Sequence, residues 1–389
     1  MTYDVVIIGG AAHGASLAYH LAAAKFDGSV LVIEKDTTFQ KAATALSASS
    51  IRQQFSTATN IEISLYGIEF LRHIGDLLEV EGDRPAISLR EGGYLFLATP
   101  EGAPVLAENH ALQVSLGADI AHLDTAGLAA RFPWLATGDL AAGCWGRTGE
   151  GWFDGYGLMQ ALRRKAAALG VKFMTGEVAG IVAEGHRAAG VTLVDGTRIN
   201  SAAVAVTAGT GTSALLAGLG IAVPVEAKKR FVFTFSCREA LPNFPLLVDP
   251  TGVYARPEGD LYISGASPLA DNDPEATDFE VDHTFFEDHV WPVLAARVPA
   301  FERIKPGRAW AGHYDLNTFD ANAIVGRLPE IDDLVVATGF SGHGLQQAPA
   351  VGRGLAELVI HGRYRTLDLS PLGYGRVAAN RPIVEKNVV

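Results

Sequence analysis

The amino-terminal part of the chain alternates between apolar runs of strand length and a segment of helical character. Apolar residues run from Val5 to Ile8 and again from Val30 to Ile33, and an alanine-rich stretch, 15–24, lies between them. Apolar runs of this length favour buried strands, whereas alanine-rich segments favour helices. The pattern therefore predicts strand, helix and strand in succession, which is the βαβ unit of a nucleotide-binding fold.

The rest of the chain changes its periodicity twice. Further elements are expected as helices over 57–79 and 157–169 and as strands over 171–174, 178–183, 189–193 and 203–206, and 92–97 is expected as a strand outside the nucleotide unit. From 221 to 310, alternating apolar residues and turn signals predict antiparallel strands over 231–235, 252–256 and 261–264, then a helix over 281–298 that Pro292 kinks. The last third returns to α/β character, with a strand over 334–338 and a helix over 345–360.

The turn after the first strand is suited to hold a pyrophosphate. Gly9 permits a sharp turn, the small Ala11 lets the backbone approach the phosphates, and Gly14 lets the helix pack close to the strand. The helix then offers amide groups and the positive end of its dipole. Glu34 lies 25 residues after Gly9, where its carboxylate would accept ribose hydroxyls and repel a 2′-phosphate. FAD or NAD therefore fits better than NADP, although Ala11 departs from the strict glycine pattern.

Composition and charge narrow the function class. The chain has 389 residues, of which 48% are hydrophobic and 19% are charged, as expected for a globular enzyme with a large core. The net charge of −12 argues against nucleic acid or an anionic membrane surface as a partner. No apolar stretch is long enough for a membrane span and no basic leader opens the chain, so a cytoplasmic location is expected.

The two cysteines, Cys144 and Cys237, lie far apart in the sequence, and neither has a cysteine or histidine at metal-ligand spacing. We therefore expect no disulfide and no metal site, and we expect both thiols to fill apolar space.

Four separated motifs carry a family resemblance. They are 9–14 with Glu34, 47–52, 207–209 and 337–344, and together they resemble the D-amino-acid-oxidase-like family of FAD-dependent oxidoreductases. This family includes enzymes that oxidise sarcosine, glycine and dimethylglycine. Segments 50–56, 310–320 and 339–349 look most like the FAD-dependent oxidoreductase domain-containing branch, which includes a mitochondrial assembly factor for respiratory complex I. The resemblance covers nearly the whole chain.

The resemblance implies an α/β fold made of two interleaved domains. A Rossmann-like βαβ domain that binds FAD would comprise residues 1–82, 146–218 and 322–389. An α+β substrate-binding domain, built on a mostly antiparallel sheet, would comprise residues 83–145 and 219–321. The flavin ring would lie at the domain interface and face the substrate sheet.

The motifs and the resemblance together assign the cofactor contacts to Gly9, Ala11, Ala12, Gly14, Glu34, Lys35, Ser47, Ser49, Arg52, Gln53, Val178, Ala208, Gly209, Gly339, Gly342, His343, Gly344, Leu345 and Gln346. Some relatives attach flavin covalently, but no cysteine lies near His313 and no histidine lies between Lys35 and Arg52. FAD is therefore expected to bind noncovalently.

The implied reaction is hydride transfer from the carbon beside an amine nitrogen to flavin N5, which gives an imine that water hydrolyses. His343 would stabilise charge on the flavin as a hydrogen-bond donor or a cation, or would simply cap a loop. Arg256 is the first candidate for the substrate carboxylate, since arginine binds carboxylates at two points, although a surface ion pair is an equal alternative. Tyr254, Tyr262 and His313 would wall the amine, together with Trp310 and Tyr314, or would be plain core.

Two departures from sarcosine-oxidising relatives leave the substrate and the electron acceptor open. Gln346 stands where those enzymes carry a carboxylate-binding lysine, and Tyr262 is the best match for their oxygen-activating lysine. The leading hypothesis is oxidation of an N-substituted glycine such as sarcosine, dimethylglycine or iminodiacetate, with oxygen or another acceptor. The alternatives are oxidative deamination of glycine or a D-amino acid, and a flavoprotein assembly factor with little catalysis.

Overall fold

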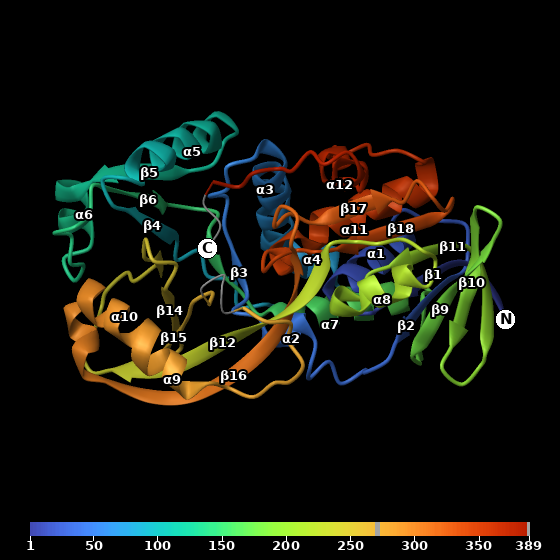
Figure 1. The fold of residues 1–389 in the computed structure, drawn as a ribbon, viewed down its shortest axis with the longest axis horizontal. Coiled ribbons are helices and arrows are strands. Elements are labelled where there is room, and N and C mark those ends of the chain that lie inside the picture. Colours follow the sequence, from blue (N-terminus) through green and yellow to red (C-terminus); the bar gives the residue numbers. More distant parts are fainter. Residues whose placement is uncertain (269–272, 387–389) are drawn as a thin grey trace.

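The computed structural model describes residues 1–268 and 273–386, and its strands form two eight-stranded sheets and one two-stranded sheet. The two large sheets lie side by side along the long axis of the molecule (Figure 1). The long strands β12 (Val225–Cys237) and β16 (Ile304–Asn317) pair with each other through most of their length. They reach from the second sheet toward the first (Figure 1).

The first sheet has a parallel centre. Its strand order is β17 (Ile324–Arg327), β18 (Leu334–Thr338), β11 (Arg198–Val206), β1 (Thr2–Ile8), β2 (Val30–Glu34) and β8 (Lys172–Thr175). Only β17 on this path pairs antiparallel to its neighbour. The antiparallel pair β9 (Val178–Glu184) and β10 (Arg187–Leu193) branches from β11. The carboxyl ends of β1, β2, β11 and β18 thus lie along one edge of the sheet, where nucleotides bind in such folds.

Both faces of this sheet are buried, which explains why β1 is apolar at consecutive positions. Val5 and Ile7 pack in one core with the helices α1 (Ala12–Ala23), α3 (Ala58–Arg72), α7 (Gly155–Ala168) and α11 (Gly344–His361). Val6 and Ile8 pack in a second core with β9, β10 and α8 (Thr212–Ala217). The alternation of side chains along one strand therefore supplies two separate cores.

The second sheet is mostly antiparallel. Its order is β16, β12, β15 (Leu261–Gly265), β14 (Tyr254–Glu258), β13 (Leu246–Val248), β4 (Tyr94–Ala98), β6 (Ala142–Gly146) and β5 (Ile120–Asp124). Only the pair β13 and β4 is parallel. One face packs on α6 (Thr125–Arg131), α9 (His283–Phe285), a π-helical turn (Phe286–Val290), α10 (Trp291–Arg297) and η4 (Pro299–Arg303). Near β5 and β6, α5 (Ala103–Ser115) packs on the other face.

Short elements connect these layers. They are α2 (Ala43–Leu46), β3 (Ser50–Ile51), α4 (Ile74–Leu77), β7 (Gly151–Trp152), η1 (Gly209–Gly211), η5 (Ser370–Leu372) and α12 (Gly375–Ala378). The strands β3 and β7 form the small sheet.

The predicted fold class, a Rossmann-like α/β unit with a mostly antiparallel second sheet, is confirmed. All strands of the first sheet fall in the segments assigned to FAD binding, and the strands of the second fall in the segments assigned to the substrate, except for Gly146 at the end of β6. That these segments are two domains with those roles stays a prediction.

Several predicted elements differ in extent from the observed ones, and three of these differences have a local physical reason. The helix expected over 57–79 is interrupted at His73, where α3 ends and α4 begins. The helix expected over 281–298 is split by the π-helical turn, and Pro292 lies in the first turn of α10, where proline is tolerated. The strand expected over 231–235 is the centre of the longer β12, whose basic residues 228–230 obscure the apolar alternation.

Candidate functional site

A cavity of about 870 Å³ lies between the two large sheets, and residues of both sheets line it. Its walls come from the turn after β1, the segment 39–52, the end of β11, the strands β12 and β16, and the turn after β18. The volume falls in the range of about 300–1,000 Å³ that cofactor and ligand sites have. The cavity runs along the edge where the parallel strands end.

The first turn needs its glycines. Gly9 has a φ of +93°, and a Cβ atom there would lie 2.5 Å from the carbonyl oxygen of Thr207. A Cβ atom at Gly14 would lie only 1.9 Å from the carbonyl oxygen of Gly9, because α1 passes directly over the turn. The structure therefore gives Gly14 the packing role that the sequence predicts, away from the cavity wall.

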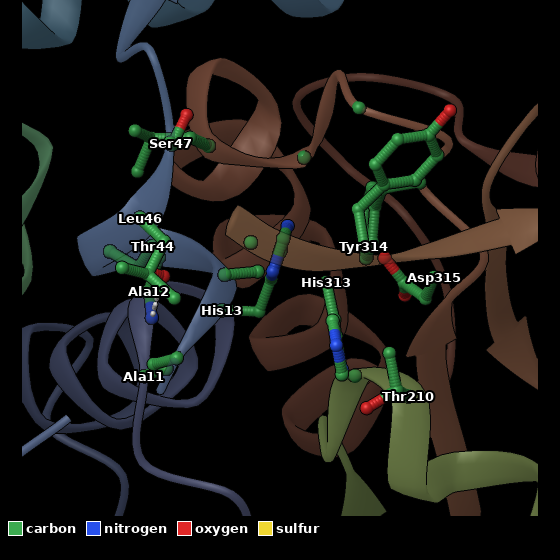
Figure 2. A pocket seen from close by; sticks show the side chains of 18 of the residues that line it. Ala11, Ala12, His13, Thr44, Leu46, Ser47, Thr210, His313, Tyr314 and Asp315 are labelled. Carbon is green, nitrogen blue, oxygen red and sulfur yellow. Dashed lines mark hydrogen bonds between the residues drawn. The ribbon is translucent and has the colours of Figure 1, made fainter. Parts of the chain in front are cut away.

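The amino terminus of α1 is open toward the cavity. Ala11 occupies the N-cap position and its side chain makes no cap, no acidic residue lies in the first turn, and the N–H of Ala12 makes only a long hydrogen bond of 3.4 Å to Thr44 Oγ1. Ala11 and Ala12 both line the cavity beside Thr44 (Figure 2). Glu34 lines it nearby, and its Oε2 and Oε1 accept the backbone N–H groups of Gly10 at 2.8 Å and Asp36 at 2.9 Å. This arrangement suits a phosphate at the helix end and a sugar at the carboxylate.

The turn after β18 forms the opposite wall and is held by β16. Gly339, Ser341 and Gly342 all have positive φ values. Asp315 of β16 accepts the N–H of Gly339 with Oδ2 at 2.7 Å, and its backbone oxygen accepts the N–H of Ser341 at 2.9 Å. Burial raises the pKa of Asp315 to about 6. Asp315 thus positions the turn that begins α11, and it lies across the pocket from Ala12 (Figure 2).

Arg52 and His343 form a charged corner of the cavity. Nη2 of Arg52 lies 3.0 Å from Nε2 of His343, and its guanidinium also stacks on the rings of Phe55 and Phe96 at 4.6 and 4.9 Å. Burial and the Arg52 charge lower the pKa of His343 to about 3. His343 is therefore neutral at physiological pH and accepts from Arg52 at Nε2, which leaves its proton on Nδ1. The cation in this corner is Arg52. The expectation that His343 stabilises charge on the flavin as a cation is therefore not supported.

The backbone beside Arg52 is fixed by buried polar groups. Gln346 accepts the N–H of Arg52 with Oε1 at 2.7 Å. The carboxylate of Glu150 accepts the N–H of Gln53 at 2.6 Å and the side-chain amide of Gln54 at 2.7 Å. Burial raises the pKa of Glu150 to about 7. Gln53 therefore positions Arg52 and does not itself line the cavity.

Most predicted site residues meet at this cavity. Those on its wall are Gly9, Ala11, Ala12, Glu34, Lys35, Ser47, Arg52, Val178, Ala208, Gly209, Tyr254, His313, Gly342, His343, Gly344, Leu345 and Gln346. Six lie off it, namely Gly14, Ser49, Gln53, Gly339, Arg256 and Tyr262. Ser49 instead shapes the loop, since its φ is +51° and its N–H donates to Ser47 Oγ at 3.0 Å.

The structure does not support Arg256 as the carboxylate ligand. Its Nε and Nη2 both donate to the backbone oxygen of Ala48, at 3.1 and 2.6 Å, and its Nη1 donates to the oxygen of Pro257 and pairs with Glu258. Trp310 acts in a similar way, because its Nε1 donates to the oxygen of Leu46 at 2.9 Å. Both side chains anchor the segment that forms one cavity wall.

Among the predicted wall aromatics, Tyr262 is part of the core. It packs on Phe235, Phe244 and Phe301 with ring centroids 5.0–5.4 Å apart, on the face of the second sheet that α10 covers. Tyr254 does line the cavity, and burial raises its pKa to about 12, so its hydroxyl stays protonated. His313 lines the cavity edge and stacks on Phe279 at 4.0 Å.

Sequence reasoning assigned no role to two further wall residues. His13 stacks on Phe340 at 3.8 Å, and its Nε2 is buried with no hydrogen-bond partner among the described residues. Arg230 of β12 lines the cavity and pairs with Asp273. Both residues lie in recognisable sequence patterns, since His13 lies inside the first glycine turn and Arg230 ends a basic run. Neither pattern, however, shows whether the side chain points into the cavity.

Other site types find no support in the part of the chain that is described. Residues 1–268 and 273–386 contain no cluster of three or more histidine, cysteine or acidic side chains that could hold a metal ion. Within the same ranges, no helix combines the length and apolarity that crossing a bilayer requires. Cys144 is buried as expected, whereas Cys237 is only half-buried and donates to the oxygen of Ala300 at 3.5 Å.

The family model for FAD dependent oxidoreductases matches residues 4–358. The chain belongs to this family. It is 41% identical to the FAD-dependent oxidoreductase domain-containing protein 1 of Xenopus laevis, over 99% of this chain and 85% of that protein, which confirms the branch resemblance. It is 27% identical to mouse peroxisomal sarcosine oxidase, over 92% of each chain. L-proline dehydrogenase from P. horikoshii has the same fold, with a TM-score of 0.87 and 25% identity, over 98% of this chain and 99% of that one.

The residues of the cavity fit the FAD of this family. The open helix end of α1 suits the pyrophosphate, and Glu34 suits the adenosine ribose. Burial lowers the pKa of His13 to about 3, so its ring is neutral, and the unpartnered Nε2 would find a partner in a cofactor hydroxyl. The part of the wall formed by Arg52, His343 and Gln346 would hold the flavin ring of the cofactor. The chain is thus an FAD-dependent oxidoreductase.

We predict that acid precipitation releases all of the flavin into the supernatant. Neither Cys144 nor Cys237 lines the cavity, and the ring of His313 is engaged with the backbone of Asp278 at 2.5 Å and with Phe279. A covalent bond to flavin needs a nucleophilic side chain that is free to reach it. Absorption spectra of the pellet and the supernatant test this, and yellow colour that stays with the pellet would contradict it.

Proposed function

We propose that this oxidoreductase oxidises the C–N bond of a small secondary amino acid, with an N-substituted glycine as the substrate class. The observation that carries the proposal is the state of Arg52. Its side chain is on the cavity wall and 5% exposed, yet no carboxylate of the described residues forms an ion pair with it. A buried guanidinium without a counter-ion is costly and favours a ligand carboxylate.

The amine end of the substrate would face an uncharged wall. Tyr254 and His343 are neutral at physiological pH, because burial shifts the pKa values of both away from the charged forms. A wall of low polarity disfavours an ammonium ion, and the neutral amine is the form that is oxidised. Bound FAD would accept the two electrons, and the protein would orient the substrate through Arg52.

The preference for a secondary amine rests on the relatives. Two proteins similar to this chain are a sarcosine oxidase and an L-proline dehydrogenase. In both sarcosine and L-proline, a secondary amine and a carboxylate are attached to the same carbon. Such substrates need a site with one anchor for the carboxylate and a neutral wall for the nitrogen.

Anaerobic bleaching of the FAD-loaded protein tests the proposal. We expect sarcosine, dimethylglycine or another N-substituted glycine to reduce the flavin, and to do so faster than glycine or D-alanine. Bleaching by the primary amino acids alone would replace the proposal with oxidative deamination. A flavin that no compound reduces would favour the assembly role instead. Later admission of oxygen shows whether the reduced protein reacts with it or needs another acceptor.

A further inference from the structure

The second arginine of the cavity wall already has a carboxylate partner within the chain. Nη1 and Nη2 of Arg230 donate to Oδ1 and Oδ2 of Asp273, each at 2.8 Å. The side chains of Arg230 and Asp273 are 17% and 13% exposed. This two-point geometry is the one by which arginine binds a free carboxylate, so Asp273 occupies the place that a ligand carboxylate would take.

The strand β12 holds Asp273 in this place from two positions. Nζ of Lys228 donates to the backbone oxygen of Asp273 at 2.7 Å, and Lys228 also forms a β-bridge with Glu275. The guanidinium of Arg230 stacks on the ring of Tyr314, with Cζ 4.5 Å from the ring centroid, and Tyr314 lines the cavity too. Arg230 is therefore part of the wall, and β12 holds Asp273, which does not line the cavity itself, against it.

The two wall arginines thus differ in charge balance. Arg52 has no carboxylate partner in the described part of the chain, whereas the charge of Arg230 is cancelled by Asp273. A substrate with one carboxylate can neutralise Arg52 and leave Arg230 undisturbed. A second carboxylate that reached the β12 side of the cavity would find Nη1 and Nη2 of Arg230 bound to Asp273 and would lie near a like charge.

We infer that Asp273 restricts the substrate to amino acids with a single carboxylate, by occupying a second carboxylate site that Arg230 would otherwise offer. The inference rests on the proposed function and narrows it. Sarcosine and dimethylglycine are accepted, whereas iminodiacetate and other amines with two acidic arms are excluded. The specificity comes from an internal competitor and not from the size of the cavity.

The test compares two sulfur analogues that cannot be oxidised as amines. Methylthioacetate has one carboxylate and thiodiacetate has two, and their binding to the FAD-loaded protein is followed by the change in the flavin absorption spectrum. We expect the wild type to bind methylthioacetate more tightly. In Asp273→Asn, the affinity for thiodiacetate relative to methylthioacetate should rise at least about tenfold, since like-charge contacts cost several kcal/mol.

Two variants serve as controls. Asp273→Glu retains the charge and should keep the wild-type preference. Asp278→Asn removes a carboxylate of the same segment that pairs at 2.7 Å with Lys229, which does not line the cavity, so it should also keep the preference. An unchanged ratio in a folded Asp273→Asn protein would overturn the inference.

The wild type alone also decides the question if Asp273→Asn fails to fold. Thiodiacetate that binds wild type as tightly as methylthioacetate would show that Asp273 excludes nothing. If instead neither compound perturbs the flavin of any variant, the proposed function fails, and the inference fails with it.

Discussion

Replacing Gly14 by valine should yield a protein that folds but retains almost no flavin. A single Cβ atom at this position would lie 1.9 Å from the backbone oxygen of Gly9 and 2.8 Å from Oγ1 of Thr207. The start of α1 would have to move away from the turn, and the amide groups that face the pyrophosphate would move with it. Misfits of this kind cost about 3 kcal/mol, which corresponds to roughly a hundredfold loss of FAD affinity.

The ratio of flavin to protein absorbance after reconstitution measures this effect, and circular dichroism reports on folding. Gly180→Val is the matched control, because a Cβ atom at Gly180 meets nothing within 4 Å and the residue lies in strand β9. A Gly14→Val protein that holds FAD as firmly as the control would show that α1 does not provide the phosphate site.

Replacing Arg52 by methionine should lower kcat/KM for the amino-acid substrate by about a hundredfold to several thousandfold. Removing one member of a buried ion pair costs about 3–5 kcal/mol, and the substrate carboxylate would lose its only free cation in this corner. Arg52→Lys should recover a part of the loss, since lysine supplies the charge but not the two-point geometry.

Amines without a carboxylate separate binding from structural damage. An N-methyl amine that lacks the acid should be oxidised at similar rates by wild type and Arg52→Met, if flavin content is equal. Arg84→Met removes an exposed arginine that pairs with Asp76 at 2.9 Å and serves as the surface control. Equal losses for substrates with and without a carboxylate would mean that Arg52 acts on the flavin environment and not on the substrate.

The glycine turns were readable from sequence because their requirements are local. Gly9 needs a positive φ and Gly14 needs the absence of a side chain, and both constraints arise within a few residues of the strand end. The helix α11 and the strand β18 were predicted closely for the same reason, since a continuous apolar strand runs into a glycine turn and an amphipathic helix.

The sequence could not show whether Arg52 or Arg256 is free to bind the substrate carboxylate, because this depends on contacts between distant segments. Arg256 lies on a strand that the pattern predicts, but it does not line the cavity, and its donors bind Ala48, Pro257 and Glu258. Arg52 has no carboxylate partner among the described residues, and Glu150 binds the neighbouring backbone instead. The length of β12 and its pairing with β16 were not predicted for the same reason. The basic residues 228–230 interrupt the apolar pattern of the strand, and each forms an ion pair with an acidic residue that only the fold brings close.

The distribution of the cavity walls along the polypeptide has a consequence for biosynthesis. One wall begins at Gly9 and another ends at Gln346, and α11 packs on α1 in a shared core. A ribosome must therefore translate the chain as far as Gln346 before the pocket can close, so that cofactor capture follows synthesis of all of its walls. Nascent chains that stall before this point would lack the turn after β18, which forms one wall of the cavity.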